Sequence, residues 1–190
     1  SFNAAGHGTQ VAGVIAAEQN NLFGISGAAP NVKVLNIRSF SPEGTGQEDD
    51  AAAAILYAIK MGAKVINMSW GDYSFSYVLR DVIRYAFSQN IVLIASAGNR
   101  NSDQPHYPSG YSEVISVSGT NSEDFLAGYN WGSTIDLVAP AIGILSTDLN
   151  SEYKPLNGTS FAAPYVSAAA ALILSKQNFT NEEIKQILKS

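Results

Sequence analysis

The sequence contains no cysteine, and only 14% of its residues are charged. Without cysteine, neither a disulfide framework nor a thiolate metal site can form. The 11 lysines and arginines form no cluster and are outnumbered by 16 aspartates and glutamates, so the net charge of −5 argues against a nucleic-acid partner. No apolar run reaches the roughly 18 residues that a membrane helix needs, and no signal-peptide pattern is present. We therefore expect no membrane partner.

What the sequence does contain is a high proportion of apolar residues. Hydrophobic residues make up 46% of the 190 positions, which is enough for one domain with a sizeable core. No internal repeat, low-complexity tract or linker divides the chain. We therefore predict a single domain over residues 1–190.

Apolar segments of strand type alternate with segments of helical periodicity over the first half of the chain. Helices are predicted at 7–17, 50–61, 77–88 and 160–176, and a last helix begins at Thr180, which has capping-box spacing with Glu183. Strands are predicted at 32–37, 65–68 and 91–95, followed by short strands at 107–109, 114–117, 135–138 and 142–145. This alternation predicts an α/β fold in which helices cover both faces of a parallel sheet.

Ser160 lies where a polar loop becomes a long apolar helix, in the segment Asn-Gly-Thr-Ser-Phe-Ala-Ala-Pro. The first N–H groups of a helix have no partner within it and can stabilise a developing negative charge. A serine nucleophile placed there still needs a base. The plain alternative is a helix N-cap, a position that serine often fills. The Gly-x-Ser-x-Gly elbow of α/β-hydrolases is excluded because Ala162 occupies its final position.

The candidate base and a candidate oxyanion donor lie in two further short segments. His7, in Gly-His-Gly-Thr, is one of only two histidines, and Asn99 ends the segment Ala-Ser-Ala-Gly-Asn after an apolar strand. A lone histidine is more often structural, and an asparagine after a strand is often a turn residue. The other histidine, His106, has the setting of a surface loop and is not expected to be catalytic.

Together, the segments around His7, Asn99 and Ser160 resemble the subtilisin-like serine proteases in order, separation and flanking residues. The resemblance covers nearly the whole chain. It implies a three-layer helix/parallel sheet/helix sandwich and a serine endopeptidase in which Ser160 is the nucleophile, His7 the base and Asn99 the oxyanion donor. No cofactor is implied for the chemistry. The sequence departs from the family pattern at Gln10, where a second histidine is usual, and this position lies outside the catalytic set.

The resemblance also implies where an extended polypeptide substrate would bind. Ser69, Trp70 and Gly71 correspond to a strand end that pairs with the substrate backbone, and Ala97 and Gly98 correspond to pocket walls. The alternative for the first segment is an ordinary exit from a strand, and Trp70 could equally belong to the core. By the same resemblance, His106 precedes Tyr107-Pro108 at the floor of the pocket for the residue before the scissile bond.

A loop containing Asn21 resembles the calcium loop of the family, in which oxygen ligands bind a hard cation. A plain turn is the alternative. The other ligands in the family come from a segment that would precede this chain, so the site would be incomplete here.

The acidic member of the family's triad is not found before His7, because residues 1–6 include no aspartate or glutamate. Either the chain is the remainder of a longer enzyme, truncated at its N-terminus, or it is a relative that binds peptide without cutting it, or a structural subunit. Truncation would remove a central strand and expose the edges of its neighbours, and so favour weak activity and self-association. An extracellular or cell-envelope location follows from the resemblance alone.

Overall fold

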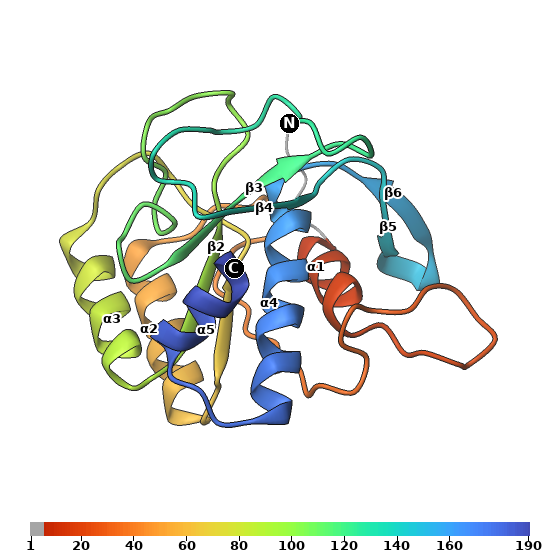
Figure 1. The fold of residues 1–190 in the computed structure, drawn as a ribbon, viewed down its shortest axis with the longest axis horizontal. Coiled ribbons are helices and arrows are strands. Elements are labelled where there is room, and N and C mark those ends of the chain that lie inside the picture. Colours follow the sequence, from red (N-terminus) through yellow and green to blue (C-terminus); the bar gives the residue numbers. More distant parts are fainter. Residues whose placement is uncertain (1–5) are drawn as a thin grey trace.

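The computed structural model describes residues 6–190. Its centre is a parallel sheet with the strand order β1-β2-β3-β4 (Figure 1). These strands are β1 (Val65–Met68), β2 (Val92–Ser96), β3 (Ile115–Thr120) and β4 (Leu137–Pro140). A separate antiparallel pair joins β5 (Ile144–Thr147) to β6 (Tyr153–Leu156).

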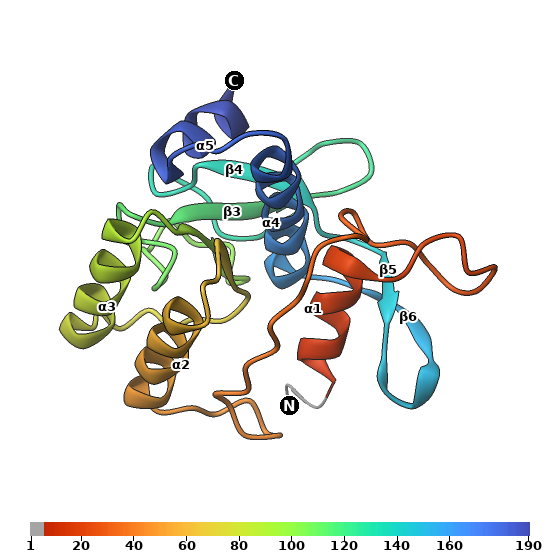
Figure 2. The same ribbon diagram turned by 90° about the horizontal axis from the view of Figure 1, so that it is seen from below.

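Helices cover both faces of the sheet. In Figure 2, α2 and α3 lie on one side of the strands, and α4 and α5 lie on the other. The helices are α1 (His7–Ala16), α2 (Glu48–Lys60), α3 (Tyr77–Ser88), α4 (Thr159–Lys176) and α5 (Asn181–Lys189), with a short 3-10 turn η1 (Leu149–Ser151) before β6. The predicted α/β sandwich is therefore confirmed. In residues 6–190, no helix combines the length and the apolarity needed to cross a membrane.

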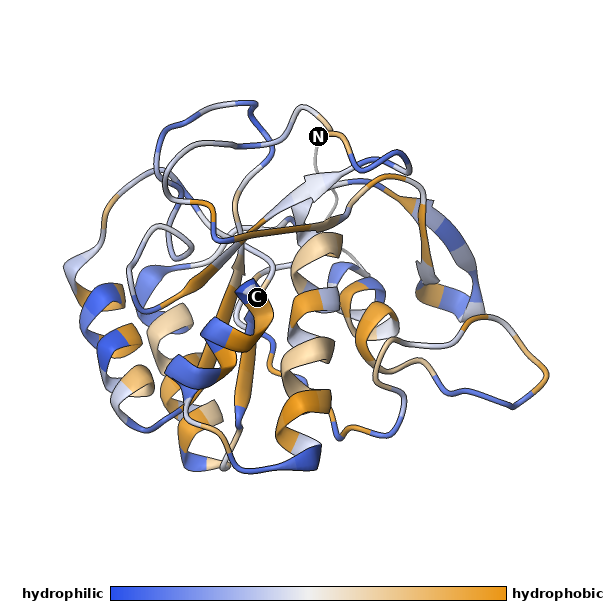
Figure 3. Cartoon of the chain, in the orientation of Figure 1, coloured by the Kyte–Doolittle hydropathy of each residue, from blue (hydrophilic) through white to orange (hydrophobic). Residues whose placement is uncertain are grey.

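Strand β2 shows why the sheet needs a helical layer on each face. All five of its residues are buried, and alternate side chains of a strand point to opposite faces. Val92 and Ile94 pack with α4 and α5, whereas Leu93 and Ala95 pack with α2 and α3. The apolar stripes of the helices and the central strands are orange in Figure 3. A strand that is apolar on both sides is stable only between two such layers.

Most predicted elements form with shifts of one or two residues at their ends, and β1 and α3 have the predicted bounds. The last helix has the predicted capping box, in which Thr180 and Glu183 exchange hydrogen bonds. Strand β6 was not predicted from the sequence. Its residues Tyr-Lys-Pro-Leu alternate only weakly in polarity, and its pairing with β5 depends on the turn between them.

Two predicted strands are not present. Residues 32–37 form no strand, and Val34 and Leu35 are 47% and 42% exposed. An apolar segment becomes a strand only when another strand satisfies its backbone, and none pairs with this segment in the part of the chain that the structure describes. Residues 107–109 also form no strand, since Tyr107 makes only an isolated bridge to Asp72.

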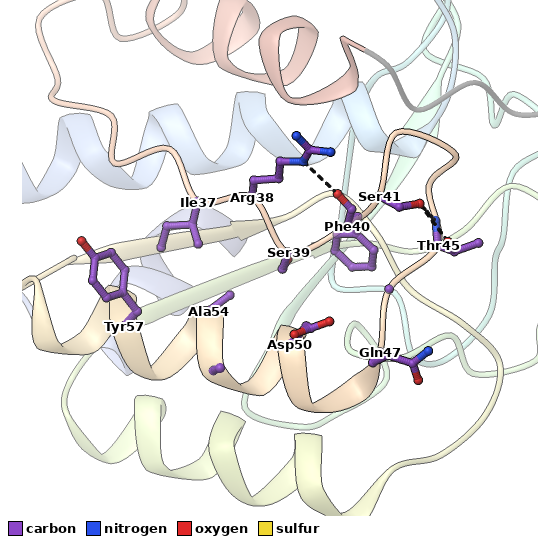
Figure 4. Close-up of a pocket in the computed structure, with 12 residues that line it drawn as sticks. Ile37, Arg38, Ser39, Phe40, Ser41, Thr45, Gln47, Asp50, Ala54 and Tyr57 are labelled. Carbon is purple, nitrogen blue, oxygen red and sulfur yellow. Dashed lines mark hydrogen bonds between the residues drawn. The ribbon is translucent and has the colours of Figure 1, made fainter.

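A hollow of about 670 Å³ separates the segment that follows residue 36 from α2. Figure 4 shows Ile37 and Phe40 on one side of it, and Ala54 and Tyr57 of α2 on the other. The hollow lies on the same side of the molecule as the unformed strand, and none of the predicted catalytic residues lines it.

Candidate active site

The N-terminus of α4 depends on a glycine. Gly158 has φ = +133° and ψ = 157°, a conformation that residues with a Cβ rarely adopt, and Thr159 and Ser160 are the first residues of the helix. From Phe161 to Ala170, α4 is almost wholly apolar, and most of its residues there are buried against the sheet. This packing fixes the helix, so the position of Ser160 is fixed with it.

Helix α1 brings His7 to the same place. Gly6 precedes it with φ = +85°, and His7 is the first helical residue. At Gly13 a Cβ would collide with the Thr147 hydroxyl group, so α1 lies directly against β5 because that position is glycine. Further hydrogen bonds join the two elements, from Ser146 Oγ to the carbonyl of Gln10 at 2.6 Å and from Thr147 Oγ1 to the carbonyl of Thr9 at 2.9 Å.

His7 and Ser160, which are far apart in the sequence, meet at one backbone atom. The carbonyl oxygen of Ser69 lies 3.1 Å from Nε2 of His7 and 3.2 Å from Oγ of Ser160. The ring of His7 also packs edge-on against Phe161, with 5.6 Å between ring centroids. The imidazole and the hydroxyl group are thus on the same side of the molecule, next to one shared acceptor.

A network of partly buried hydrogen bonds joins Ser69 to α4. Ser69 Oγ donates to the carbonyl of Ser160 at 2.8 Å and accepts from Nδ2 of Asn67 at 2.9 Å. Oδ1 of Asn67 accepts a hydrogen bond of 2.8 Å from the hydroxyl group of Ser167, which lies about two turns after Ser160 in α4. The end of β1 and the start of α4 are therefore held together by three side chains, of which the sequence analysis singled out only Ser69.

Asn99 is oriented by the residue before Ser160. Its Oδ1 accepts hydrogen bonds from the backbone N–H of Thr159 at 2.9 Å and from the Thr159 hydroxyl group at 3.0 Å. The same hydroxyl group accepts from the N–H of Gly98 at 3.2 Å. Since both donors engage the oxygen, the amide nitrogen of Asn99 is turned away from Thr159 and remains a donor beside the start of α4.

The environment of His7 favours the neutral imidazole. Burial lowers the pKa of His7 below its ordinary value, and the hydrogen bond to the carbonyl of Ser69 opposes that shift only in part. A group that accepts a proton must be neutral at the working pH, so burial suits His7 to that task.

The remaining predicted residues follow β1 and β2. Because these two strands are parallel neighbours, the residues lie together at the carboxyl end of the sheet. Ser69, Trp70 and Gly71 follow β1, and Ala97 and Gly98 follow β2. Of these, Trp70 serves partly as core: its ring lies 5.3 Å from that of Phe40, and it packs against the cluster between the sheet, α2 and α3.

His106 does not have the surface setting that was predicted for it. It is only 8% exposed, its Nδ1 lies 3.1 Å from the carbonyl oxygen of Ser96, and its ring packs edge-on against Tyr73. A Cβ at Gly71 would collide with this ring. His106 therefore fills the space between the two segments that follow β1 and β2, because the bridge between Asp72 and Tyr107 draws its loop inward.

The predicted metal residue, Asn21, lies in the loop between α1 and α2. It is exposed, and its Oδ1 accepts a hydrogen bond from the N–H of Phe23 at 3.1 Å. Within residues 6–190, no group of three or more histidine, cysteine, aspartate or glutamate residues could hold a metal ion. The described residues alone do not fit a complete calcium site, and the calcium loop stays a prediction.

The fold and the arrangement of residues 7, 99 and 160 define a class of protein, the α/β sandwich proteins of the subtilisin type. The profile of the subtilase family matches residues 2–190, and the chain belongs to that family.

Individual relatives agree with this assignment. The chain is 41% identical to the thermophilic serine proteinase of Bacillus sp. (strain AK1) over 184 residues, which cover 96% of this chain and 46% of that protein. It is 39% identical to thermitase of Thermoactinomyces vulgaris, covering 92% of this chain and 63% of thermitase. A solved structure of proteases from Pseudoalteromonas arctica superposes with a TM-score of 0.92 at 34% identity, covering 96% of this chain and 62% of that one. The chain thus spans about half to two thirds of the length of these relatives.

Proposed function

We propose that this chain carries the catalytic residues of a serine endopeptidase, with Ser160 as the nucleophile, His7 as the general base and Asn99 as an oxyanion donor. The observation that supports this most strongly is the convergence of His7 Nε2 and Ser160 Oγ on the carbonyl oxygen of Ser69. Membership of the subtilase family supports the same reaction.

In this mechanism the hydroxyl proton of Ser160 passes to Nε2 of His7 while Oγ attacks the carbonyl carbon of the scissile bond. The negative charge that forms on the substrate oxygen is stabilised by the N–H of Ser160, at the start of α4, and by Nδ2 of Asn99. The proton then moves from His7 to the leaving amine as the C–N bond breaks. Water attacks the acyl group in the same way, and Ser160 is regenerated.

The geometry also supports a proposal about the order of the steps. A carbonyl oxygen only accepts hydrogen bonds, so the contact between His7 and Ser69 needs a proton on Nε2. Ser160 can transfer its proton to Nε2 only after His7 adopts the other tautomer. In serine proteases of this type a carboxylate holds the histidine in that tautomer. We therefore propose that a change of tautomer at His7 precedes acylation.

The substrate is proposed to be an extended polypeptide whose backbone lies along Ser69–Gly71, with the pocket walls near Ala97 and Gly98. Ser69–Gly71 follows β1 and is proposed to pair with the substrate as an added strand, a mode that depends little on side-chain sequence, and Ala97–Gly98 follows the neighbouring parallel strand β2 at the same end of the sheet. An extracellular or cell-envelope location is proposed from family membership.

The test is covalent modification by a fluorophosphonate probe, followed by mass spectrometry of the modified peptide. We expect the wild-type chain to be labelled on Ser160, Ser160→Ala to be unlabelled, and Ser175→Ala, a change on the same helix, to be labelled as the wild type is. Labelling that persists in Ser160→Ala would place the nucleophile elsewhere. Peptide binding by a wild-type chain that is not labelled would instead identify a peptide-binding relative.

Self-association is proposed for the edge of the sheet at β1. Among residues 6–190 this strand pairs only with β2, and Val34, Leu35 and Tyr57 carry exposed apolar side chains. Sedimentation should show concentration-dependent association that Leu35→Lys weakens, whereas Leu172→Lys, which changes an equally exposed leucine on α4, should not weaken it.

A further inference from the structure

The loop that carries Asn99 is held by hydrogen bonds to one buried residue, Asn130, which is distant in the sequence. Asn130 follows β3, and its backbone and side chain bond to the loop on both sides of Asn99. Its Nδ2 donates to the carbonyl of Ala97 at 2.8 Å, its N–H donates to the carbonyl of Gly98 at 3.1 Å, and its Oδ1 accepts from the N–H groups of Arg100 at 2.9 Å and Ser102 at 3.4 Å. Figure 1 shows the segment after β3 arching over the same end of the sheet as the loop after β2.

Asn130 is itself fixed in place. It is 1% exposed, and its own carbonyl accepts a hydrogen bond from Ser118 Oγ of β3 at 2.5 Å. The hydroxyl group of Tyr73 lies 2.9 Å from its Nδ2 and 3.2 Å from its Oδ1. Contact with the loop is close, because a Cβ at Gly98 would lie 2.6 Å from Nδ2 of Asn130. The side chain therefore uses both of its polar atoms to hold backbone in a buried site.

An oxyanion donor must be held where charge develops, since donors that need no reorganisation stabilise that charge best. Asn99 is exposed and sits on a loop, so neither burial nor regular secondary structure fixes it. Thr159 fixes the orientation of its amide group from the side of α4. The backbone on either side of Asn99 is fixed from the opposite side by Asn130.

We infer that Asn130 is a positioning residue for the oxyanion donor. It affects the reaction by fixing the position of Asn99. This inference rests on the proposed role of Asn99. Asn130 also bonds to the carbonyls of Ala97 and Gly98 in the proposed pocket walls, so the test uses a fluorophosphonate that carries no group for that pocket. With this probe, loss of Asn130 should lower the maximal rate of Ser160 modification and leave probe binding nearly unchanged.

The experiment compares Asn130→Ala and the milder Asn130→Asp with a matched control, Asn181→Ala. Asn181 is a second buried asparagine whose Nδ2 donates to backbone carbonyls, those of Phe87 and Ile91, but Ile91 precedes β2 whereas Asn99 follows it. The melting temperature of each variant is measured by thermal unfolding to compare stability. Fluorophosphonate modification is followed over a range of probe concentrations, which separates the maximal rate from the half-saturating concentration.

We expect the maximal rate of modification to fall about 10- to 100-fold in Asn130→Ala, while the half-saturating probe concentration changes less than about threefold. Removal of such a donor costs about 10²–10³ in a subtilisin, a member of this family, so a displaced donor should cost somewhat less. Asn181→Ala should lower the melting temperature and keep the wild-type rate. Adding Asn130→Ala to Asn99→Ala should slow modification by less than threefold. Losses that multiply in the double variant, or an equal loss in Asn181→Ala, would overturn the inference.

A second readout does not depend on reactivity. In NMR spectra, Asn130→Ala and Asn130→Asp should shift the side-chain amide signal of Asn99, and Asn130→Ala should speed hydrogen exchange at the amides of Arg100 and Ser102. Unchanged signals and exchange would contradict the positioning role even if the chain is not labelled at all. Absence of labelling in the wild type, with these NMR changes present, would instead contradict only the proposed protease function.

Discussion

Strand β2 and residues 32–37 are both apolar stretches, but one is buried in the folded chain and the other is partly exposed. The region formed by β2, the loop of Asn99 and the start of α4 is hydrogen-bonded across the fold, and Ile94 of β2 has no exposed surface. The segment 17–47 also contains an apolar stretch, yet Val34 and Leu35 in it remain almost half exposed. An apolar stretch therefore predicts a strand only where neighbouring strands and two helical layers are available to cover it.

The hydrogen bonds differ in the same way. At the site they join residues far apart in the sequence, such as Ser69 to Ser160 and Asn99 to Thr159. In residues 20–45, side-chain hydrogen bonds join near neighbours, as between Ser41 and Thr45. Long-range bonds form only when the whole fold forms, whereas local bonds survive without it. We expect the two regions to respond differently to matched substitutions.

The largest difference should come from paired truncations in the two apolar stretches. Ile94→Ala opens a cavity in the buried core and should lower the free energy of unfolding by about 2–5 kcal/mol. Leu35→Ala removes a half-exposed side chain and should cost less than about 1 kcal/mol. Denaturant unfolding of both variants measures this. Equal losses would show that residues 32–37 are packed as well as β2 is.

A matched pair of threonines tests the hydrogen bonds. Thr159→Val removes the buried hydroxyl group that bonds to Asn99 and Gly98, and should cost about 1–3 kcal/mol of stability and about tenfold in the rate of phosphonate modification. Thr45→Val removes a hydroxyl group on the exposed loop and should change stability by less than about 0.5 kcal/mol, with no change in rate. A normal rate in Thr159→Val would mean that Asn99 does not need this anchor.

Ion pairs between Asp136 and two lysines of α5 should stabilise the protein in a pH-dependent way. Burial alone would raise the pKa of Asp136, but hydrogen bonds from Lys189, Lys185 and the N–H of Ser116 outweigh it and lower that pKa. The folded pKa is below the unfolded value, so the stabilisation is present above about pH 4 and is lost as pH falls through the folded pKa. Asp136→Asn should cost about 1–2 kcal/mol near neutral pH and less under strongly acidic conditions. Urea titrations at several pH values check this, and a cost that does not depend on pH would contradict it.

The smallest expected effect is a shift in a pH profile. The proposed base must be neutral to act, and burial lowers the pKa of His7. The rate of phosphonate modification should therefore rise with pH through a midpoint below about 6.5, the ordinary histidine value, and then reach a plateau. A midpoint above about 7 would show that a negative charge, not burial, dominates at His7.

The sequence predicted the helices well because their signals are local. The capping box at Thr180 and the apolar spacing of α3 lie within single segments, and both features are present in the structure. The short strands were placed less well. Strand β6 was missed, and residues 32–37 and 107–109 were wrongly predicted, because a strand is defined by a partner elsewhere in the chain.

Several residues around the site gave no usable signal in the sequence. Asn130 stands in a polar loop segment and Ser167 within an apolar helix, and nothing in either neighbourhood indicates a bond to Ala97 or to Asn67. His106 was predicted to lie at the surface, since its loop is polar, and it is buried. Each of these side chains acquires its environment from segments that meet only in the folded chain.

The sequence by itself determined the family, the α/β class and the residue types that the chemistry needs, because glycine-bounded motifs and apolar periodicity are properties of short segments. Only the tertiary structure decided that His7 and Ser160 meet at the carbonyl of Ser69, and that Asn130 encloses the loop of Asn99. The physical reason is that a hydrogen bond depends on the distance between two atoms in space. For residues far apart in the chain, that distance is set by the packing of the helices and strands between them.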